Sequence, residues 1–254
     1  MKKNITVIFI VFFIVLIFVF AYVINNGKII QGFENTSFGI DKYVGTIYYI
    51  NLDDRPDRKR EFLSEISKID FPNKHIVRIP GVYKEKKGGL GCSLSHIKAL
   101  KKFIHSNEDY CMIFEDDFIF NEETMGKVTE YLFNLFENNI SFDVCMLSGL
   151  ILKSEPTEYK FLNKVINGQT ASGYIVSKAF APVLLQNFTE SAELLGKDYS
   201  KYNVYALDQY WKKLQPSNNW YIFYPKLGKQ RASFSNIEGK TVNYENFTWK
   251  IINE

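Results

Sequence analysis

The chain has 254 residues, of which 46% are hydrophobic and 23% charged, and this balance excludes a disordered protein. The net charge of +3 arises within residues 1–28, which contain three lysines and no acid, because residues 29–254 carry 28 basic and 28 acidic side chains. A body without net charge lacks the basic surface that nucleic acids require, so we expect no nucleic-acid partner. Three cysteines exclude a disulfide framework, and Cys111 and Cys145 lie in apolar runs typical of a core.

Residues 5–24 form an apolar run in which Thr6 is the single polar side chain. At 1.5 Å per residue a helix of this length spans the ~30 Å hydrocarbon core of a bilayer, which predicts a transmembrane signal anchor. Cleavage as a signal peptide is the alternative. Lys2 and Lys3 place a short tail, residues 1–4, in the cytoplasm. We therefore expect a single-pass type II membrane protein with a lumenal or external body, in the Golgi or ER if the host is eukaryotic.

Residues 25–43 show neither a helical nor a strand period, and we expect them to form a stem before a folded body at residues 44–254. Glycosylation sequons after the anchor occur at Asn35, Asn139, Asn187 and Asn246. All four are candidates for modification if the body is lumenal.

From residue 46 onward, strand-like apolar runs alternate with segments of helical period. Strands are predicted at residues 46–51, 75–79, 111–114, 143–147, 173–176 and 220–224. Helices are predicted from Pro56, from about Ser93, after an N-cap at Asn121, through Leu184 and across residues 207–214. This alternation predicts an α/β fold with a mostly parallel sheet flanked by helices. Such sheets bind ligands beyond the carboxyl ends of their strands.

The first predicted strand ends in Asn51, and the charged residues Asp53, Arg55 and Arg58 follow it. Amide and carboxylate oxygens accept hydrogen bonds from ribose and base, and arginine pairs with phosphate. On spacing alone, a helix start with solvated charges explains the same residues equally well.

The third predicted strand runs into Glu115, Asp116 and Asp117. Adjacent carboxylates in a poorly solvated site repel one another by several kcal/mol. Glu115 and Asp117 fall on the same side of an extended chain, where Mg²⁺ or Mn²⁺ would neutralise them. The alternative is that the three acids splay into water.

A glycine-rich segment, residues 88–91, leads into the next helix together with Ser95 and His96. Glycine lets the backbone approach a ligand closely, and a helix N-terminus favours anions. The spacing matches neither a P-loop nor a dinucleotide fingerprint. His96 is equally well explained as a structural histidine.

Three blocks together resemble glycosyltransferase family 25, which includes lipopolysaccharide-biosynthesis glycosyltransferases and procollagen galactosyltransferases. The blocks are residues 49–58 (YINLDDRPDR), 91–96 (GCSLSH) and 113–117 (IFEDD), and their order and spacing match the family. Weaker similarity continues through residues 171–177, Asp208 and residues 230–237. The resemblance thus covers about residues 45 to 238.

The resemblance implies a GT-A-like α/β fold and inverting, metal-assisted transfer of a hexose from a UDP-sugar. We expect galactose or glucose as the hexose, and a glycan, lipopolysaccharide or glycoprotein as the acceptor. The expected donor-binding residues are Asn51, Asp53, Arg55, Arg58, Gly89, Gly91, Ser95, His96 and Asp116. Glu115 and Asp117 would hold Mn²⁺ or Mg²⁺. Asp208, ahead of Asp143, would be the general base.

One departure from the pattern concerns the metal. Many GT-A enzymes have a late histidine as a further metal ligand, and this chain has no histidine after His105. We therefore expect the carboxylates, the diphosphate and water alone to hold the ion, and hence weakly.

Two other functions stay open from the sequence. One is a non-catalytic carbohydrate-binding protein that keeps the fold, and the other is a nucleotidyltransferase, which also uses metal-bound carboxylates. Tyr174 and Trp211 could stack on sugar rings, although burial in the core is the commoner role of such aromatics. Residues 150–170 and the segment after residue 190 carry no readable code for an acceptor.

Overall fold

The structure is a computed structural model that describes residues 43–69, 75–235 and 240–242, all within a compact unit spanning residues 40–254. The expected tail, the anchor at residues 5–24 and nearly all of the stem lie outside the described residues. Among the residues that are described, no helix combines the length and the apolarity needed to cross a bilayer. The domain boundaries given above stay predictions.

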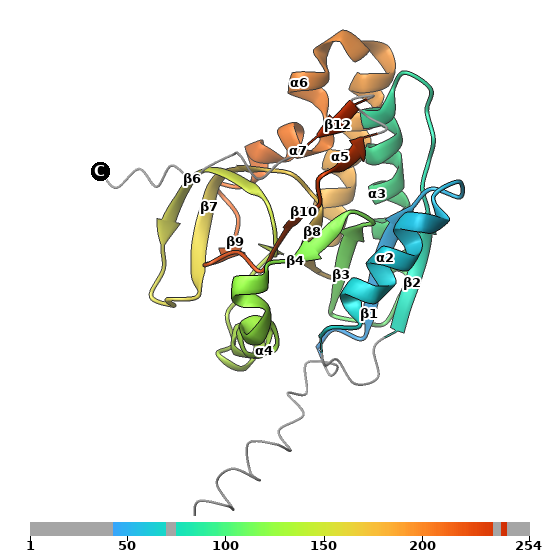
Figure 1. Ribbon diagram of the computed structural model, residues 1–254. Coiled ribbons are helices and arrows are strands. Elements are labelled where there is room, and N and C mark those ends of the chain that lie inside the picture. The colour runs from blue at the N-terminus through green and yellow to red at the C-terminus, as the bar shows by residue number, and fades with distance from the viewer. Residues whose placement is uncertain (1–42, 70–74, 236–239, 243–254) are drawn as a thin grey trace, which may run out of the picture. The chain divides into compact units, whose positions relative to one another are not determined.

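Strands and helices alternate over the first part of the unit, and the later part adds a hairpin and a helical layer (Figure 1). The strands are β1 (Thr46–Asn51), β2 (His75–Pro80), β3 (Tyr110–Glu115), β4 (Phe118–Phe120), β5 (Val144–Met146), β6 (Leu150–Pro156), β7 (Leu162–Gln169), β8 (Gly173–Ser177), β9 (Trp220–Phe223), β10 (Gly228–Gln230), β11 (Ser233–Ser235) and β12 (Lys240–Val242). The α-helices are α2 (Pro56–Ile66), α3 (Gly88–Ile104), α4 (Val128–Glu137), α5 (Ala181–Lys197), α6 (Tyr202–Tyr205) and α7 (Leu207–Tyr210). Short 3-10 helices cover Glu122–Lys127, Tyr199–Lys201 and Trp211–Leu214.

Eight strands form the central sheet in the order β2-β1-β3-β8-β5-β9-β7-β6. β1 pairs in parallel with β2 and β3, and β5 pairs in parallel with β9. β8 and β7 run against each of their neighbours. The α/β fold with most strands in one direction is confirmed. The reversal of β7 follows from its direct hairpin connection to β6, since a short turn can join only antiparallel strands.

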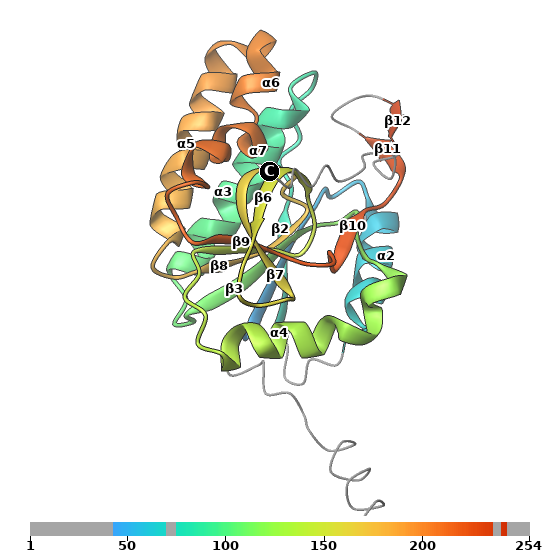
Figure 2. The ribbon, with the colours of Figure 1, turned by 90° about the vertical axis from the view of Figure 1, so that its left-hand side faces the viewer.

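Helices cover both faces of the sheet, with α3 and α5 on one side and α2 on the other (Figure 2). Alternation along β1 explains this arrangement, because neighbouring side chains of a strand point to opposite faces. Tyr49 stacks on Phe62 of α2 with ring centroids 4.8 Å apart. Tyr48 joins the buried cluster beneath α3 and α5. Both faces of β1 are therefore buried, as the continuous apolar run of this strand predicts.

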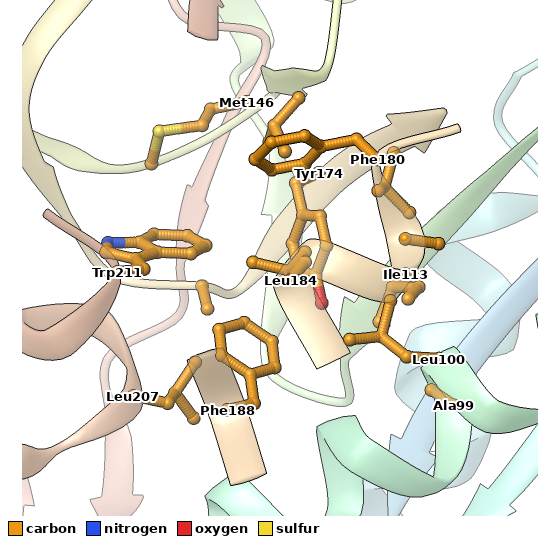
Figure 3. Close-up of a cluster of buried hydrophobic side chains, with 14 of the residues drawn as sticks. Ala99, Leu100, Ile113, Met146, Tyr174, Phe180, Leu184, Phe188, Leu207 and Trp211 are labelled. Atoms are coloured by element: carbon orange, nitrogen blue, oxygen red, sulfur yellow. The ribbon is translucent and has the colours of Figure 1, made fainter. Parts of the chain in front are cut away.

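The largest side chains of the core gather where α5 and α7 meet the sheet (Figure 3). Trp211 and Tyr174 are fully buried and meet edge to face with centroids 5.9 Å apart. Phe188 of α5 packs against the same tryptophan. Neither Trp211 nor Tyr174 is available to stack on a sugar, so their interpretation as core residues is confirmed. Cys111 and Cys145 are likewise buried.

The helix predicted from about Ser93 begins earlier, at Gly88. The glycines therefore lie in the first turn of α3 and not in a turn before it. A side chain at Gly91 would clash with the loop before the helix, because its Cβ would lie 2.2 Å from the carbonyl oxygen of Val82. A glycine permits this approach of the β2–α3 loop to the helix.

Two further segments differ from the sequence prediction. Residues 150–169 form the hairpin β6–β7, where the sequence predicts no strand because polar and apolar residues do not alternate regularly. The helix predicted across residues 207–214 is divided into α7 and a 3-10 helix.

Asn121 occupies an N-cap position, but its side chain donates to the carbonyl oxygen of Lys226 at 2.8 Å and makes no cap hydrogen bond.

One predicted glycosylation site is incompatible with the fold. Asn187 is 3% exposed within α5, and its amide donates to the carbonyl oxygen of Tyr210 at 3.4 Å. Asn139 is exposed. Asn35 and Asn246 lie outside the described residues.

Candidate functional site

Two cavities open at the carboxyl ends of β1 and β3 and meet at Cys92, Glu115 and Gln230. The smaller cavity, of about 140 Å³, lies over the end of β1 and the start of α2. The larger one, of about 470 Å³, is bounded by the end of β7 and by α6 and α7. The candidate site thus lies beyond the carboxyl ends of these strands, where the sequence predicts it.

A buried polar network forms the floor of the smaller cavity. Asn51 is 2% exposed and donates to the Asp116 carboxylate at 2.7 Å. Arg58 Nη1 donates to Asp116 at 2.9 Å and reaches Asp117 at 3.5 Å. Burial raises the pKa of Asp116, against the opposing effects of Asn51 and Arg58. The structure therefore brings these predicted residues together from β1, α2 and the end of β3.

The other charged residues after β1 are held at the rim of the site. Arg55 lines the smaller cavity and forms an ion pair with Asp57 at 2.8 Å. Asp53 is exposed and pairs with Arg78 at 2.6 Å. Arg78 also donates to the Asn51 side chain at 3.0 Å. Asp53 thus contributes through Arg78 and does not itself line the cavity.

Glu115 and Asp117 face each other where the two cavities meet, bridged by one amide. Gln230 Nε2 donates to Glu115 at 3.2 Å and lies 3.5 Å from Asp117. Burial, followed by the negative charge of Glu115, raises the pKa of Asp117 to about 7. Burial acts on Glu115 too, but hydrogen bonds from His96 and Cys92 outweigh it and hold its pKa below the usual value. The carboxylate repulsion expected from the sequence is therefore present and falls on Asp117.

His96 acts on the site through Glu115. The ring is completely buried, with Nε2 3.2 Å from Glu115 Oε1 and Nδ1 3.0 Å from the hydroxyl of Tyr174. An ionised Glu115 accepts from Nε2, which leaves Nδ1 to accept from Tyr174. His96 therefore positions the carboxylate and does not line either cavity, which corrects its assignment as a donor-binding contact.

Cys92, His96 and Glu115 offer ligand atoms within 4.8 Å of one another. Burial raises the pKa of the Cys92 thiol well above its usual range, and Glu115 adds to this. The thiol donates to Glu115 at 3.4 Å. Both ring nitrogens of the histidine already have partners. As it stands, this group is a hydrogen-bond network that fixes the orientation of Glu115.

The glycine segment contributes by packing. Gly91 and Ser95 line the smaller cavity, and Ser95 Oγ accepts from the Val82 amide at 2.8 Å. Gly89 lines the larger cavity, where a Cβ would lie 2.2 Å from the ring of Tyr202. The absent side chains are therefore explained by the loop at Val82 and by Tyr202, without a bound ligand.

Asp208 stands on the wall of the larger cavity at the start of α7. Its carboxylate accepts from the Thr170 amide at 2.9 Å. Thr170 adopts a φ of 76°, which is unfavourable for a β-branched residue and places strain beside the carboxylate. Burial raises the pKa of Asp208, as expected for a carboxylate that accepts a proton during a reaction.

Asp143 lies at the opposite end of the strands from Glu115. It precedes β5, accepts from the Asn219 amide at 2.8 Å, and its carbonyl oxygen accepts from Ser177, the partner of Tyr110 at the beginning of β3. Glu115 ends that same β3. The structure therefore does not bring Asp143 together with the other candidate residues.

Sequence reasoning assigned no role to several residues that line the site. Gln230 touches both carboxylates, and Lys226 and Lys229 line the larger cavity with Tyr202. Burial and the nearby Lys229 lower the pKa of Lys226. The signal for Gln230 was its place at the start of the last block that resembles the family. A lone lysine or tyrosine in a loop or short helix gives no such signal.

A family model described as glycosyltransferase family 25 (LPS biosynthesis protein) matches residues 83–200. The matched segment contains α3, β3 and the three carboxylates Glu115, Asp116 and Asp117 at the end of that strand. The resemblance to this family is therefore confirmed, and it supports a transferase. Asn51, Arg58 and Asp208 lie outside the matched segment. No curated protein sequence matches the chain.

Solved structures give distant matches. A glycosyltransferase involved in glycosylation of the major capsid of PBCV-1 matches with a TM-score of 0.43 and 12% identity over 76% of this chain and 95% of that chain. Residues 1–349 of S. aureus TarS match with a TM-score of 0.42 and 14% identity over 74% of this chain and 60% of that chain. A mannose-1-phosphate geranyltransferase from Thermus thermophilus matches with a TM-score of 0.39 and 11% identity over 74% of each chain. At these values the likenesses assign no activity.

Proposed function

We propose that the chain is a GT-A-like, inverting hexosyltransferase that uses a UDP-sugar, expected to be UDP-galactose or UDP-glucose. The observation that supports this is the meeting of two cavities at Glu115, since arginines line one cavity and the Asp208 carboxylate lines the other. The donor nucleotide takes the smaller cavity, whose lining includes the guanidinium groups of Arg55 and Arg58. Asn51 supports this lining by holding Asp116. The hexose and its acceptor take the larger cavity.

A divalent cation fits between Glu115 and Asp117. Asp117, whose contacts to Gln230 and Arg58 are both 3.5 Å long, is under-compensated beside the charge of Glu115, which is the condition that a hard cation with oxygen ligands relieves. Mn²⁺ or Mg²⁺ at these residues would supply positive charge to the departing diphosphate. Gln230 and Arg58 hold the two side chains in place for that role.

Asp208 is the proposed general base. The acceptor hydroxyl oxygen attacks the anomeric carbon, its proton passes to the Asp208 carboxylate, and the bond from the anomeric carbon to the diphosphate oxygen breaks with its electron pair leaving on UDP. A carboxylate with a raised pKa on the wall of the larger cavity suits this proton transfer. Attack opposite the leaving group inverts the anomeric centre.

The proposal includes a type II membrane anchor at residues 5–24 and a lumenal or external catalytic domain. Its support is the length and apolarity of that run and the two lysines before it. A glycan, a lipopolysaccharide or a glycoprotein is the acceptor class that such a location would present.

The test is release of UDP by the full-length protein in detergent with Mn²⁺ and a panel of UDP-hexoses. We expect turnover with at least one donor, and loss of turnover on removal of the cation with EDTA. Binding of sugars without UDP release would indicate the non-catalytic alternative. Release of pyrophosphate from a nucleoside triphosphate and a sugar phosphate would indicate a nucleotidyltransferase.

A further inference from the structure

Tyr202 presents an aromatic ring at the larger cavity. It opens α6, beside α3 and α5 (Figures 1 and 2), and lines the cavity while remaining 37% exposed. Its hydroxyl makes no hydrogen bond to any residue that the structure describes. Burial raises the pKa of this hydroxyl. Tyr202 and Asp208 line the same cavity, and α6 packs against α7, which carries Asp208.

Packing against the backbone of α3 fixes the position of this ring. A Cβ on Gly89 would lie 2.2 Å from Cε2 of Tyr202, so the ring lies directly on the helix backbone. The hydroxyl of Tyr199 accepts from the Gly89 amide at 3.0 Å, and its ring lies 5.7 Å from that of Tyr202. Gly89 thus makes room for an aromatic side chain that lines the cavity and stays partly exposed.

The surrounding groups complete a surface for a sugar ring. Asn203, Gln209 and Gln169 line the same cavity and offer amide donors and acceptors for hydroxyl groups. A pyranose has an apolar face of C–H bonds that packs on an aromatic ring, and a rim of hydroxyls that need polar partners. A peptide hydroxyl has no such face.

We infer that Tyr202 is the platform for the acceptor sugar and that the acceptor is therefore the pyranose ring of a glycan rather than an amino-acid side chain. The inference rests on the proposed function and deepens it. The acceptor sugar is favoured over the donor sugar because Tyr202 opens α6, which packs against α7, and Asp208 of α7 must contact the attacking hydroxyl. Lipopolysaccharide, free glycan and glycoprotein glycan share this pyranose chemistry.

The experiment compares Tyr202→Phe, Tyr202→Leu and Gly89→Ala in the full-length protein, with Val204→Ala as a matched control. Val204 is in the same short helix, is 52% exposed and does not line either cavity. The acceptors are methyl glycosides of common hexoses, and a hydroxyl-bearing peptide is the negative acceptor. The readouts are the KM for acceptor, the KM for donor, hydrolysis of donor by water, and hexoside binding by saturation-transfer NMR.

We expect Tyr202→Leu and Gly89→Ala to raise the acceptor KM about tenfold or more, equivalent to about 1.4 kcal/mol, because the first removes the ring and the second displaces it. Donor KM and hydrolysis should stay unchanged. Tyr202→Phe and Val204→Ala should stay within about threefold of wild type. Hexoside binding should weaken in the Leu and Ala variants at unchanged melting temperature.

An unchanged acceptor KM in Tyr202→Leu overturns the inference, as does a rise in donor KM, which would assign the ring to the donor sugar. Transfer to the peptide and to no hexoside overturns it as well. If wild type releases no UDP from any donor, the proposed function fails. Hexoside binding that depends on Tyr202 then still decides whether the platform exists, and its absence rejects it.

Discussion

At the scale of single residues, the site is built from carboxylates whose charges are unequally compensated. Asp116 accepts hydrogen bonds from Asn51 and Arg58, and Glu115 accepts one from His96. The contacts of Asp117 with Arg58 and Gln230 are long, at 3.5 Å each. The sequence predicted the acids at this place because they follow an apolar strand. It could not predict how compensation is divided, since the partners come from α2, α3 and β10.

Asp117→Asn tests this division of charge. The pKa of Asp117 is raised to about 7 in the fold, from 3.8, so the folded state binds this proton more tightly than the unfolded chain does. Asp117 therefore costs no stability below about pH 4, and its cost grows as pH rises through about 7. In EDTA at pH 8 we expect the Asn variant to be more stable than wild type by roughly 1–3 kcal/mol, and at pH 4 equally stable.

Urea unfolding at both pH values measures the difference between the two proteins. With Mn²⁺ the same variant should lose metal-dependent donor binding and activity. Full activity of Asp117→Asn with added Mn²⁺ would remove this residue from the metal site.

Asp208→Asn separates chemistry from binding. The amide keeps the size of the side chain and can still accept from Thr170, but it cannot take a proton at neutral pH. We expect kcat to fall about 10²–10⁴-fold, with little change in UDP affinity or melting temperature. Loss of UDP binding would assign Asp208 to the donor site, and a wild-type rate would refute the base role.

At the scale of elements, tight packing around α3 sets the shape of the site. The sequence indicated glycines before a helix and favoured contact of their backbone with a ligand. In the structure, Gly91 and Gly89 accommodate Val82 and Tyr202, which are nine and 113 residues away along the chain respectively. The hairpin β6–β7 was also not predicted, because its polar and apolar residues do not alternate regularly.

Gly91→Ala should destabilise the protein because its Cβ would lie 2.2 Å from the carbonyl oxygen of Val82, a backbone atom that cannot rotate away. We expect a loss of roughly 1–3 kcal/mol, the usual cost of overpacking. Gly126→Ala is the control, since nothing lies within 4 Å of a Cβ at that glycine. Equal melting temperatures for the two variants would contradict the packing role of Gly91.

At the scale of the whole molecule, a mixed sheet brings residues from distant parts of the chain to one edge. Parallel strands β1 and β3 bring Asn51 and Glu115 to the same end, as the alternation of strands and helices predicts. The strand at β8 was predicted but its reversed direction was not, because an apolar run has the same composition in either direction. Asp143 precedes β5, which runs in the same direction as β3, so it lies at the opposite end of the strands from Glu115.

The anchor makes a prediction for the intact chain. Full-length protein should remain in the membrane pellet after alkaline carbonate extraction, because residues 5–24 are long enough to span the bilayer. A chain starting at residue 25 should appear in the supernatant. Release of the full-length protein by carbonate, or an N-terminus found beyond residue 24, would favour a cleaved signal peptide.

The anomeric configuration of the product tests glycosyl transfer most directly. NMR can follow an α-linked UDP-hexose, Mn²⁺ and a methyl hexoside with the full-length protein, since the anomeric proton coupling reports both transfer and stereochemistry. We expect a new β-linked disaccharide and stoichiometric UDP, both formed about 10²–10⁴-fold more slowly with Asp208→Asn. An α-linked product, or a UDP-hexose that stays intact across all donors and acceptors, would contradict this expectation.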